Sequence, residues 1–203
     1  IGAGRIVYQE LTRITKSIEE GDFFSNPEFI AAIENCKKNN SKLHILGLVS
    51  DGGVHSHIRH LYGLLEMAKR RDFEDVYIHC FLDGRDTPPA SAESYILKLQ
   101  EKMNEKQIGK IASISGRFYA MDRDKRWQRV QKCYDALVNG QGNKAGSVVK
   151  AIEDSYQKEV FDEFVEPTVI CNGEEPIATI GKNDSVIFFN FRPDRAREIT
   201  RTL

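Results

Sequence analysis

The sequence predicts an α/β fold, a three-layer sandwich with a mostly parallel sheet, helices on both faces and a small β-hairpin addition. The first observation is a set of near-continuous apolar runs, which are typical of strands covered on both faces. These runs occupy residues 43–49, 76–82, 111–114 and 186–191. The second is that segments with helical spacing of apolar residues separate the first three runs, which favours right-handed crossovers between parallel strands.

Two helices are expected before the first strand. Apolar residues recur at helical spacing from Leu11 to Ile18, and Gly21 then suits the position just after a helix C-terminus. Asn26 is a suitable N-cap and Pro27 a suitable first helical residue, so a second helix should begin there. We interpret both helices as structural.

A helix is also expected after each of the first three strands, because apolar side chains recur on one face of each following segment. These positions are Leu61, Leu64, Leu65 and Ala68, then Tyr95, Ile96, Leu99 and Met103, then Trp127, Val130, Tyr134 and Leu137. Residues 147–157 predict one more helix. Residues 167–180 contain two short β-rich runs around residues 172–175, which indicate a hairpin lid or an edge addition to the sheet.

The composition is that of an ordinary globular domain. Hydrophobic residues make up 40% and charged residues 29% of the 203 residues, which excludes a disordered tail. The 29 Lys and Arg residues are balanced by 30 Asp and Glu residues, so the chain has no overall positive field that would attract nucleic acid. Any anion must therefore be bound by a local group of cations.

The sequence favours a cytoplasmic protein. No apolar stretch reaches the roughly 20 residues that span a bilayer, and no basic-then-apolar secretory leader is present. The four cysteines are widely spaced, which favours buried reduced thiols over disulfides or a zinc site. They are Cys36, Cys80, Cys133 and Cys171. Because the chain begins without methionine and stops within a predicted helix, we expect it to be a piece of a longer protein.

The predicted strands share a polar tip. Residues 50–57, 83–86, 115–124 and 192–195 each follow an apolar run and combine glycine or proline with histidine, arginine or aspartate. In an open α/β sheet, the carboxyl ends of parallel strands line the ligand crevice. We therefore expect these four loops to meet at one site.

Six arginines stand at or just after the predicted strand ends. They are Arg85, Arg117, Arg123, Arg126, Arg192 and Arg195. Guanidinium groups bind carboxylate and phosphate through paired hydrogen bonds and stay charged at any working pH. Five of them together predict a site for a small, doubly anionic ligand, whereas we interpret Arg126 as a surface ion-pair residue.

The histidine-rich segment after the first strand has two interpretations. In one, Asp51, His55, His57 and Asp86 are the ligands of a self-contained metal-dependent hydrolase. In the other, a histidine at a helix start hydrogen-bonds a phosphate, helped by the helix dipole and the free N–H groups of the first helical turn. For His57 and His60 the bland interpretation is packing or helix capping.

Asp86 is the candidate for acid/base chemistry. A carboxylate beside arginines is held in its ionised form, which suits proton transfer with a hydroxyl group. The alternative is a structural brace that orients Arg85. No serine or cysteine forms a recognisable nucleophile arrangement, and residues 2–4 lack the preceding strand that a dinucleotide-binding fingerprint requires. His44 and His79 are interpreted as strand residues without chemistry.

Four motifs in this chain resemble the cofactor-independent phosphoglycerate mutases, specifically their phosphotransferase domain. The motifs lie at residues 50–57, 81–86, 115–124 and 190–195, and residues 1–5 resemble the segment just after the family's phosphorylated serine. The resemblance implies a set of substrate-binding residues, with Asp86 as the general acid/base. They are His55, Arg85, Asp86, Arg117, Arg123, Arg192 and Arg195.

The resemblance also implies partners outside the chain. In the family, a phosphatase-like domain of the same protein carries the nucleophilic serine and two metal ions, usually manganese. The whole enzyme, an isomerase of glycolysis, interconverts 3-phosphoglycerate and 2-phosphoglycerate through a phosphoserine intermediate. Since the serine and the metal ligands are missing here, we expect this chain to hold no metal and to be inactive alone. We further expect a monomer that binds neither nucleic acid nor membrane.

The resemblance places domain boundaries near both ends of the chain. We expect residues 1–10 to be an interdomain hinge segment and residues 11–189 to be the phosphotransferase domain. Residues 190–203 would be a return hinge towards the absent phosphatase-like domain, since both ends must lead back to it. A noncatalytic binding domain for small phosphorylated acids is a further interpretation.

Overall fold

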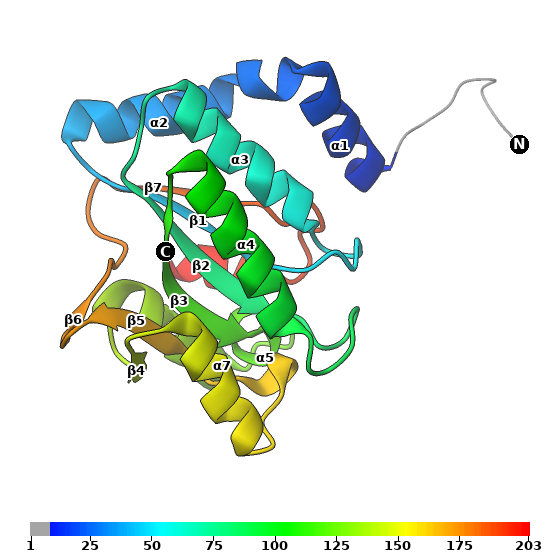
Figure 1. The fold of residues 1–203 in the computed structure, drawn as a ribbon, viewed down its shortest axis with the longest axis vertical. Helices are drawn as coiled ribbons and strands as arrows, with labels where there is room; N and C mark the ends of the chain where they lie inside the picture. The colour runs from blue at the N-terminus through cyan, green and yellow to red at the C-terminus, as the bar shows by residue number, and fades with distance from the viewer. Residues whose placement is uncertain (1–8) are drawn as a thin grey trace, which may run out of the picture.

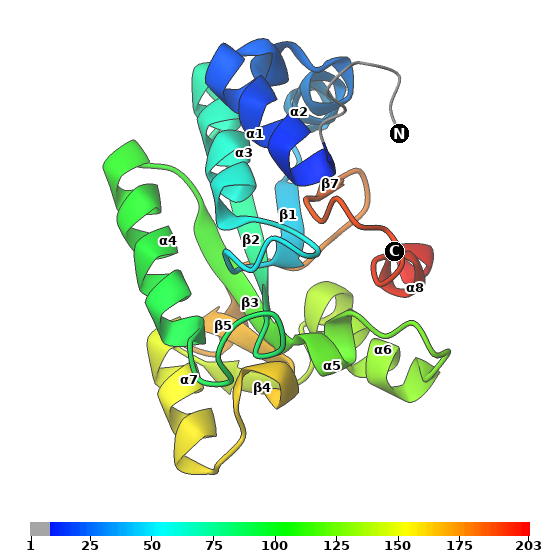
Figure 2. The same ribbon diagram turned by 90° about the vertical axis from the view of Figure 1, so that its right-hand side faces the viewer.

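The fold was obtained as a computed structural model, which describes residues 9–203. Residues 1–8, which make up most of the hinge segment predicted over residues 1–10, lie outside the described residues. The described part is a three-layer α/β sandwich, so the predicted fold class is confirmed (Figures 1 and 2).

The central sheet has seven strands in the order β4-β5-β3-β2-β1-β7, with β6 paired to β5. Their bounds are β1 Leu43–Leu48, β2 Val76–Leu82, β3 Lys110–Gly116, β4 Asn143–Ala145, β5 Thr168–Asn172, β6 Glu175–Pro176 and β7 Ser185–Phe188. The strands β3, β2, β1 and β7 are all parallel, as predicted, so their carboxyl ends share one edge of the sheet. The predicted hairpin, β5 with β6, extends the sheet beyond β3, because β5 pairs antiparallel with both β3 and β6. It is not the edge of the sheet, since β4 pairs in parallel with β5 and is the outermost strand.

The helices cover both faces of the sheet. One face carries α1 Glu10–Glu20, α2 Pro27–Asn39, α3 Ile58–Arg70, α4 Ala92–Lys106 and α7 Val148–Gln157, and the other carries α5 Arg117–Ala120, α6 Trp127–Tyr134 and α8 Arg197–Thr202 (Figure 2). Three shorter helical segments are η1 Asp22–Ser25, η2 Asp135–Asn139 and η3 Asp162–Phe164. Strand β1 shows why both layers form, because Leu43 and Ile45 pack in one core cluster and Leu46 and Leu48 in the other.

Local signals in the sequence act as predicted at the two N-terminal helices. Gly21 ends α1 with a φ of 91°, in the left-handed region that favours glycine. The Asn26 side chain caps α2 by accepting hydrogen bonds from the N–H groups of Glu28 (3.0 Å) and Phe29 (3.4 Å). These two signals are enough to set where the helices end and begin.

Two local predictions need correction. Trp127, predicted on the apolar face of its helix, is 46% exposed, because it is the first residue of α6 and the helix buries Val130 and Cys133 instead. The fourth apolar run is also longer than its strand. Strand β7 ends at Phe188, and the Asn190 side chain, rather than a backbone carbonyl, accepts the hydrogen bond from the N–H of Leu48 (3.0 Å).

A buried polar chain crosses the sheet. The carboxylate of Asp184 lies 3.1 Å from His44, His44 lies 2.9 Å from His79, and His79 lies 2.7 Å from the hydroxyl of Ser113. Burial lowers the pKa of His79 well below its ordinary value and lowers that of His44 despite the opposing charge of Asp184. Both imidazoles are therefore neutral near pH 7, and the chain satisfies polar groups that would be costly to bury alone.

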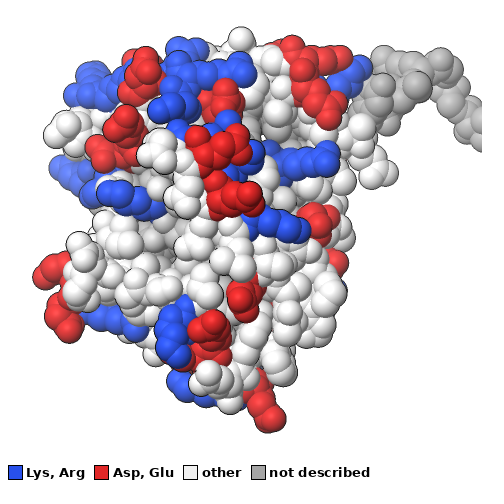
Figure 3. All heavy atoms as spheres, viewed as in Figure 1, with Lys and Arg blue, Asp and Glu red and all other residues white. Residues whose placement is uncertain are grey.

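The surface of the described residues carries both signs of charge. On the face shown in Figure 3, basic and acidic side chains are interspersed.

The four cysteines are free and buried, as predicted. In residues 9–203, no helix combines the length and the hydropathy needed to cross a membrane.

Candidate functional site

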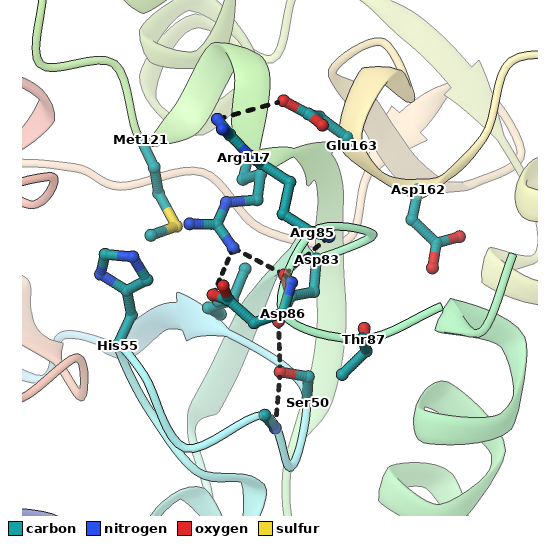
Figure 4. Close-up of polar contacts among 12 residues, drawn as sticks. Ser50, His55, Asp83, Arg85, Asp86, Thr87, Arg117, Met121, Asp162 and Glu163 are labelled. Atoms are coloured by element: carbon teal, nitrogen blue, oxygen red, sulfur yellow. Dashed lines mark hydrogen bonds and ion pairs between the residues drawn. The ribbon is translucent and has the colours of Figure 1, made fainter. Parts of the chain in front are cut away.

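The loop after β2 is organised by the buried carboxylate of Asp83, which is 2% exposed. One carboxylate oxygen accepts a hydrogen bond from the hydroxyl of Ser50 (2.7 Å), and the other accepts from the N–H groups of Arg85 (3.2 Å) and Asp86 (3.0 Å) (Figure 4). Gly84 makes this tight turn possible, since its φ of 72° suits glycine. Arg85 and Asp86 are thus held on a rigid turn at the strand end.

Arg117 ties this turn to the end of β3. It is the first residue of α5 and only 4% exposed, and its Nη1 donates to Asp83 Oδ1 and to Asp86 Oδ2, both at 2.6 Å (Figure 4). Burial would raise the pKa of Asp83, but the hydrogen bonds from Ser50 and from the Asp86 N–H, together with Arg117, hold it below its ordinary value. Asp83 therefore stays ionised at neutral pH.

If Asp86 were a brace for Arg85, its carboxylate would bind the Arg85 side chain. The carboxylate binds Arg117 instead. Arg85 lies 3.6 Å from Glu163, a residue that no sequence pattern pointed to. Both contacts are visible in Figure 4.

The loop after β7 is organised by a second aspartate, Asp194. Its carboxylate accepts a hydrogen bond from Arg123 (2.7 Å) and one from Arg192 (3.0 Å), and it lies 3.8 Å from Nδ1 of His55. Burial would raise the pKa of Asp194, but the two arginines hold it below its ordinary value. The N–H of Phe191 donates to the carbonyl of His55 (2.9 Å), which fixes this loop against the loop after β1.

His55 lies between the two clusters. It is 3% exposed, and its Nδ1 has no hydrogen-bond partner among residues 9–203. The pKa of His55 is lowered mainly by burial and further by the positive charges of Arg117 and Arg192. The negative charges of Asp86 and Asp194 raise this pKa and so oppose part of the shift. The imidazole is therefore neutral at pH 7, and its Nδ1 is buried without a hydrogen-bond partner among the described residues.

Arg195 completes the cationic group. Its Nη1 donates to the carbonyl of Met121 (3.1 Å). Burial lowers its pKa, and the positive charges of Arg123, Arg117 and Arg85 lower it further. Because these charges act on Arg195, guanidinium groups from three separate loops must lie close enough to repel one another.

The structure therefore brings together all seven residues that the sequence selected. They are His55, Arg85, Asp86, Arg117, Arg123, Arg192 and Arg195. The three residues for which we predicted surface ion pairing, packing or helix capping make structural contacts instead of joining this group. The exposed Arg126 contributes its N–H to Asp122 at the start of α6, His57 caps α3 by accepting from the Arg59 N–H, and His60 packs with its Nε2 3.0 Å from the Thr15 hydroxyl.

The alternative of a self-contained metal-dependent hydrolase is wrong in its geometry. Its four proposed ligands have separate partners: Asp51 accepts from the Tyr95 hydroxyl, His57 caps a helix, Asp86 binds Arg117, and His55 Nδ1 lies 3.8 Å from Asp194. No group of three or more His, Cys, Asp or Glu side chains within residues 9–203 has the arrangement of a metal site. The described residues thus do not fit the manganese ions that the resemblance implies for the whole enzyme.

Comparison with known proteins identifies the family of this chain. Residues 14–203 match the family described as BPG-independent PGAM N-terminus. The 2,3-bisphosphoglycerate-independent phosphoglycerate mutase of Acetivibrio thermocellus is 65% identical over 201 residues, covering 99% of this chain and 39% of that protein. The protein of the same name from Clostridium botulinum is 61% identical over 203 residues, covering 100% of this chain and 40% of the relative.

A solved structure gives the same result. It is described as crystal structures of Leishmania mexicana phosphoglycerate mutase at low cobalt concentration, and it superposes with a TM-score of 0.91 at 31% sequence identity. The match covers 98% of this chain and 38% of that chain, so this chain spans about 40% of the length of the relatives it matches. On the family match over residues 14–203, the chain belongs to the family BPG-independent PGAM N-terminus.

Proposed function

We propose that this chain is the phosphoglycerate-binding part of a 2,3-bisphosphoglycerate-independent phosphoglycerate mutase. The whole protein would be an isomerase that interconverts 3-phosphoglycerate and 2-phosphoglycerate through a phosphoserine intermediate. The observation that carries the proposal is the gathering of five arginines and a neutral, partly unpartnered His55 at the carboxyl edge of the sheet. The names of the relatives supply the reaction.

The arginines divide into two groups with different roles. Arg117 is buried and committed to Asp83 and Asp86, so it would hold the acid/base residue in place and contribute positive charge to the site. The side chains of Arg123 and Arg192 are 44% and 46% exposed and share Asp194 as a partner. A phosphate or carboxylate entering the site would replace that weak surface pairing with charge-assisted, paired hydrogen bonds.

Asp86 would serve as the general acid/base. Its carboxylate is 20% exposed, and Arg117 binds one of its oxygens, so the other oxygen is available to a substrate hydroxyl. In the proposed reaction it takes the proton from the hydroxyl that accepts the phosphoryl group and returns a proton in the opposite direction. Arg85, next to it on the same turn, would bind the substrate anion.

The nucleophilic serine and the divalent metal ions would lie in segments outside this chain. The described residues do not form a site for these ions, so no step here is assigned to them. The phosphatase-like domain is thus a proposed partner within the same polypeptide, with residues 190–203 as a proposed return hinge. A cytoplasmic location and a monomeric state remain expectations.

Titration of 3-phosphoglycerate into the chain, followed by calorimetry, tests the binding role. We expect weak binding by the chain, further loss in Arg123→Ala and Arg192→Ala, and unchanged binding in Arg126→Ala. The last variant is the matched control, because Arg126 is also exposed and lies in the same connecting segment as Arg123. Equal affinity in all four proteins would show that the exposed arginines do not contact the ligand.

Mutase turnover tests the second half of the proposal. The full-length polypeptide that carries this chain should interconvert the two phosphoglycerates, and the 203-residue chain alone should not. Clear turnover by the isolated chain would contradict the assignment of the nucleophile to another segment.

A further inference from the structure

The short helix η3 packs against the two loops that carry Arg85, Asp86 and Arg117. Asp162, its first residue, is fully buried, with 0% of its surface exposed. One oxygen of its carboxylate accepts hydrogen bonds from the N–H groups of Ser91 and Ala92, both at 2.9 Å, and from the Ser91 hydroxyl at 3.3 Å. The other oxygen accepts from the hydroxyl of Tyr156.

These hydrogen bonds cap α4 from outside its own sequence. Ser91 is the N-cap residue of α4 by position, yet its side chain accepts no capping hydrogen bond. The carboxylate of Asp162, distant in the sequence, takes that role and also places a negative charge at the positive end of the helix. The N–H of Asp162 in turn donates to the carbonyl of Pro89 (3.0 Å).

The loop between β2 and α4 is consequently fixed at both ends by a buried carboxylate. Asp83 holds its beginning and Asp162 its end, with Arg85 and Asp86 between them (Figure 4). A catalytic loop needs such anchoring, because a misplacement of about 1 Å can cost on the order of a hundredfold in rate.

The backbone of η3 also lies against Gly84 and Gly116, the residues that precede Arg85 and Arg117. A Cβ atom at Gly84 would lie 2.9 Å from the backbone nitrogen of Glu163, and one at Gly116 would lie 2.3 Å from its carbonyl oxygen. The N–H of Gly116 donates to the carbonyl of Val165 (2.7 Å). A shift of η3 would therefore move the supports of Arg85 and of Arg117 together.

We propose that Asp162 is a positioning residue that holds Arg85 and Asp86 in place for the reaction. The inference rests on the proposed function of those two residues. Asp162 touches no reacting atom in this role and acts through the N–H groups of Ser91 and Ala92.

The test uses the full-length polypeptide that carries this chain, with Asp162→Ala, Asp162→Asn and two control variants. We expect Asp162→Ala to lower kcat for 3-phosphoglycerate by on the order of tenfold to a hundredfold, since it displaces the acid/base residue. Asp162→Asn keeps a carbonyl oxygen for the two N–H groups and should recover part of that loss. Asp154→Asn, on the exposed side of α7, removes only a surface ion pair with Lys150 and should leave kcat unchanged.

Glu163→Gln is the second control, one residue away. It removes the ion pair with Arg85 but keeps the backbone of η3 and the hydrogen bonds of Asp162. We expect KM no higher than in the parent protein, because a carboxylate that competes with the substrate for Arg85 is lost. If Asp162 and Glu163 only stabilised the fold, Asp162→Ala and Glu163→Gln would instead have similar effects on kcat and KM.

Hydrogen exchange supplies a readout that does not depend on activity. The Ser91 and Ala92 amides should exchange about tenfold faster in Asp162→Ala, since each loses a buried acceptor, while amides of β1 stay protected. Unchanged exchange at these two amides would overturn the proposal, as would a loss of kcat explained entirely by a smaller folded fraction. If the parent polypeptide shows no mutase turnover, the proposed function fails, and the exchange result still decides whether Asp162 anchors the loop.

Discussion

Replacing Arg117 with methionine should destabilise the fold, because it removes the buried cation between two carboxylates. Its guanidinium is 4% exposed, and its partners Asp83 and Asp86 have side chains 2% and 20% exposed. Methionine fills similar space without charge, so the change isolates the electrostatic effect from the loss of packing.

The magnitude follows from the burial of Asp83. Breaking a buried ion pair by removing one partner costs roughly 3–5 kcal/mol, since the remaining charge is left uncompensated. Asp83 keeps hydrogen bonds from Ser50 and from two backbone N–H groups, so we expect the lower end, about 3 kcal/mol. The exposed pair of Arg123 and Asp194 should contribute at most about 1 kcal/mol.

Urea unfolding of the chain measures both effects. Arg117→Met should lower the unfolding free energy by about 3 kcal/mol and Arg123→Met by less than about 1 kcal/mol. The double variant Asp83→Asn with Arg117→Met should recover part of the loss, since the asparagine leaves no unpaired charge. Equal losses in the two single variants, or no recovery in the double variant, would refute the reasoning from burial.

Three further predictions concern pH, packing and thiol reactivity. Burial lowers the pKa of His60 to about 4, so the unfolded chain binds a proton that the folded chain excludes; stability should fall from about pH 6.5 to pH 4 by about 3 kcal/mol more than in His60→Gln, measured by urea unfolding at each pH. Gly116→Ala should cost about 1–3 kcal/mol because its Cβ would meet the Glu163 carbonyl, whereas Gly146→Ala, with nothing within 4 Å, should change thermal stability little. Burial raises the pKa of Cys133 to about 12 and that of Cys80 further, so a thiol reagent should label neither cysteine until urea unfolds the chain; labelling of the folded chain would contradict the burial.

Local patterns in the sequence were sufficient for the architecture. The alternation that places Leu43 and Ile45 on one side of β1 and Leu46 and Leu48 on the other already required helices on both faces. Likewise, Gly21 and Asn26 fixed helix ends through their own backbone preferences and side-chain hydrogen bonds. These features could be predicted because each depends on residues within a turn or two of one another.

The gathering of the strand-end loops could also be predicted, and for a topological reason. Parallel strands bring their carboxyl ends to one edge, so charged residues that follow Val49, Leu82 and Gly116 must come near one another whatever the details of packing. The proximity of the selected residues was therefore expected without coordinates, and their role in binding stays a prediction. Trp127 was assigned wrongly, because helical spacing alone does not say where a helix begins relative to the core.

By itself, the sequence determined the α/β class, the strand-end loops and the cationic residues that they carry. Only the tertiary structure decided which partner each acid binds: Asp86 binds Arg117, Glu163 pairs with Arg85, and Asp162 accepts from the N–H groups at the start of α4. The physical reason is that these contacts join segments far apart in the chain, and their strength depends on burial. No spacing in the sequence encodes how deeply a carboxylate will be buried or which donor will reach it there.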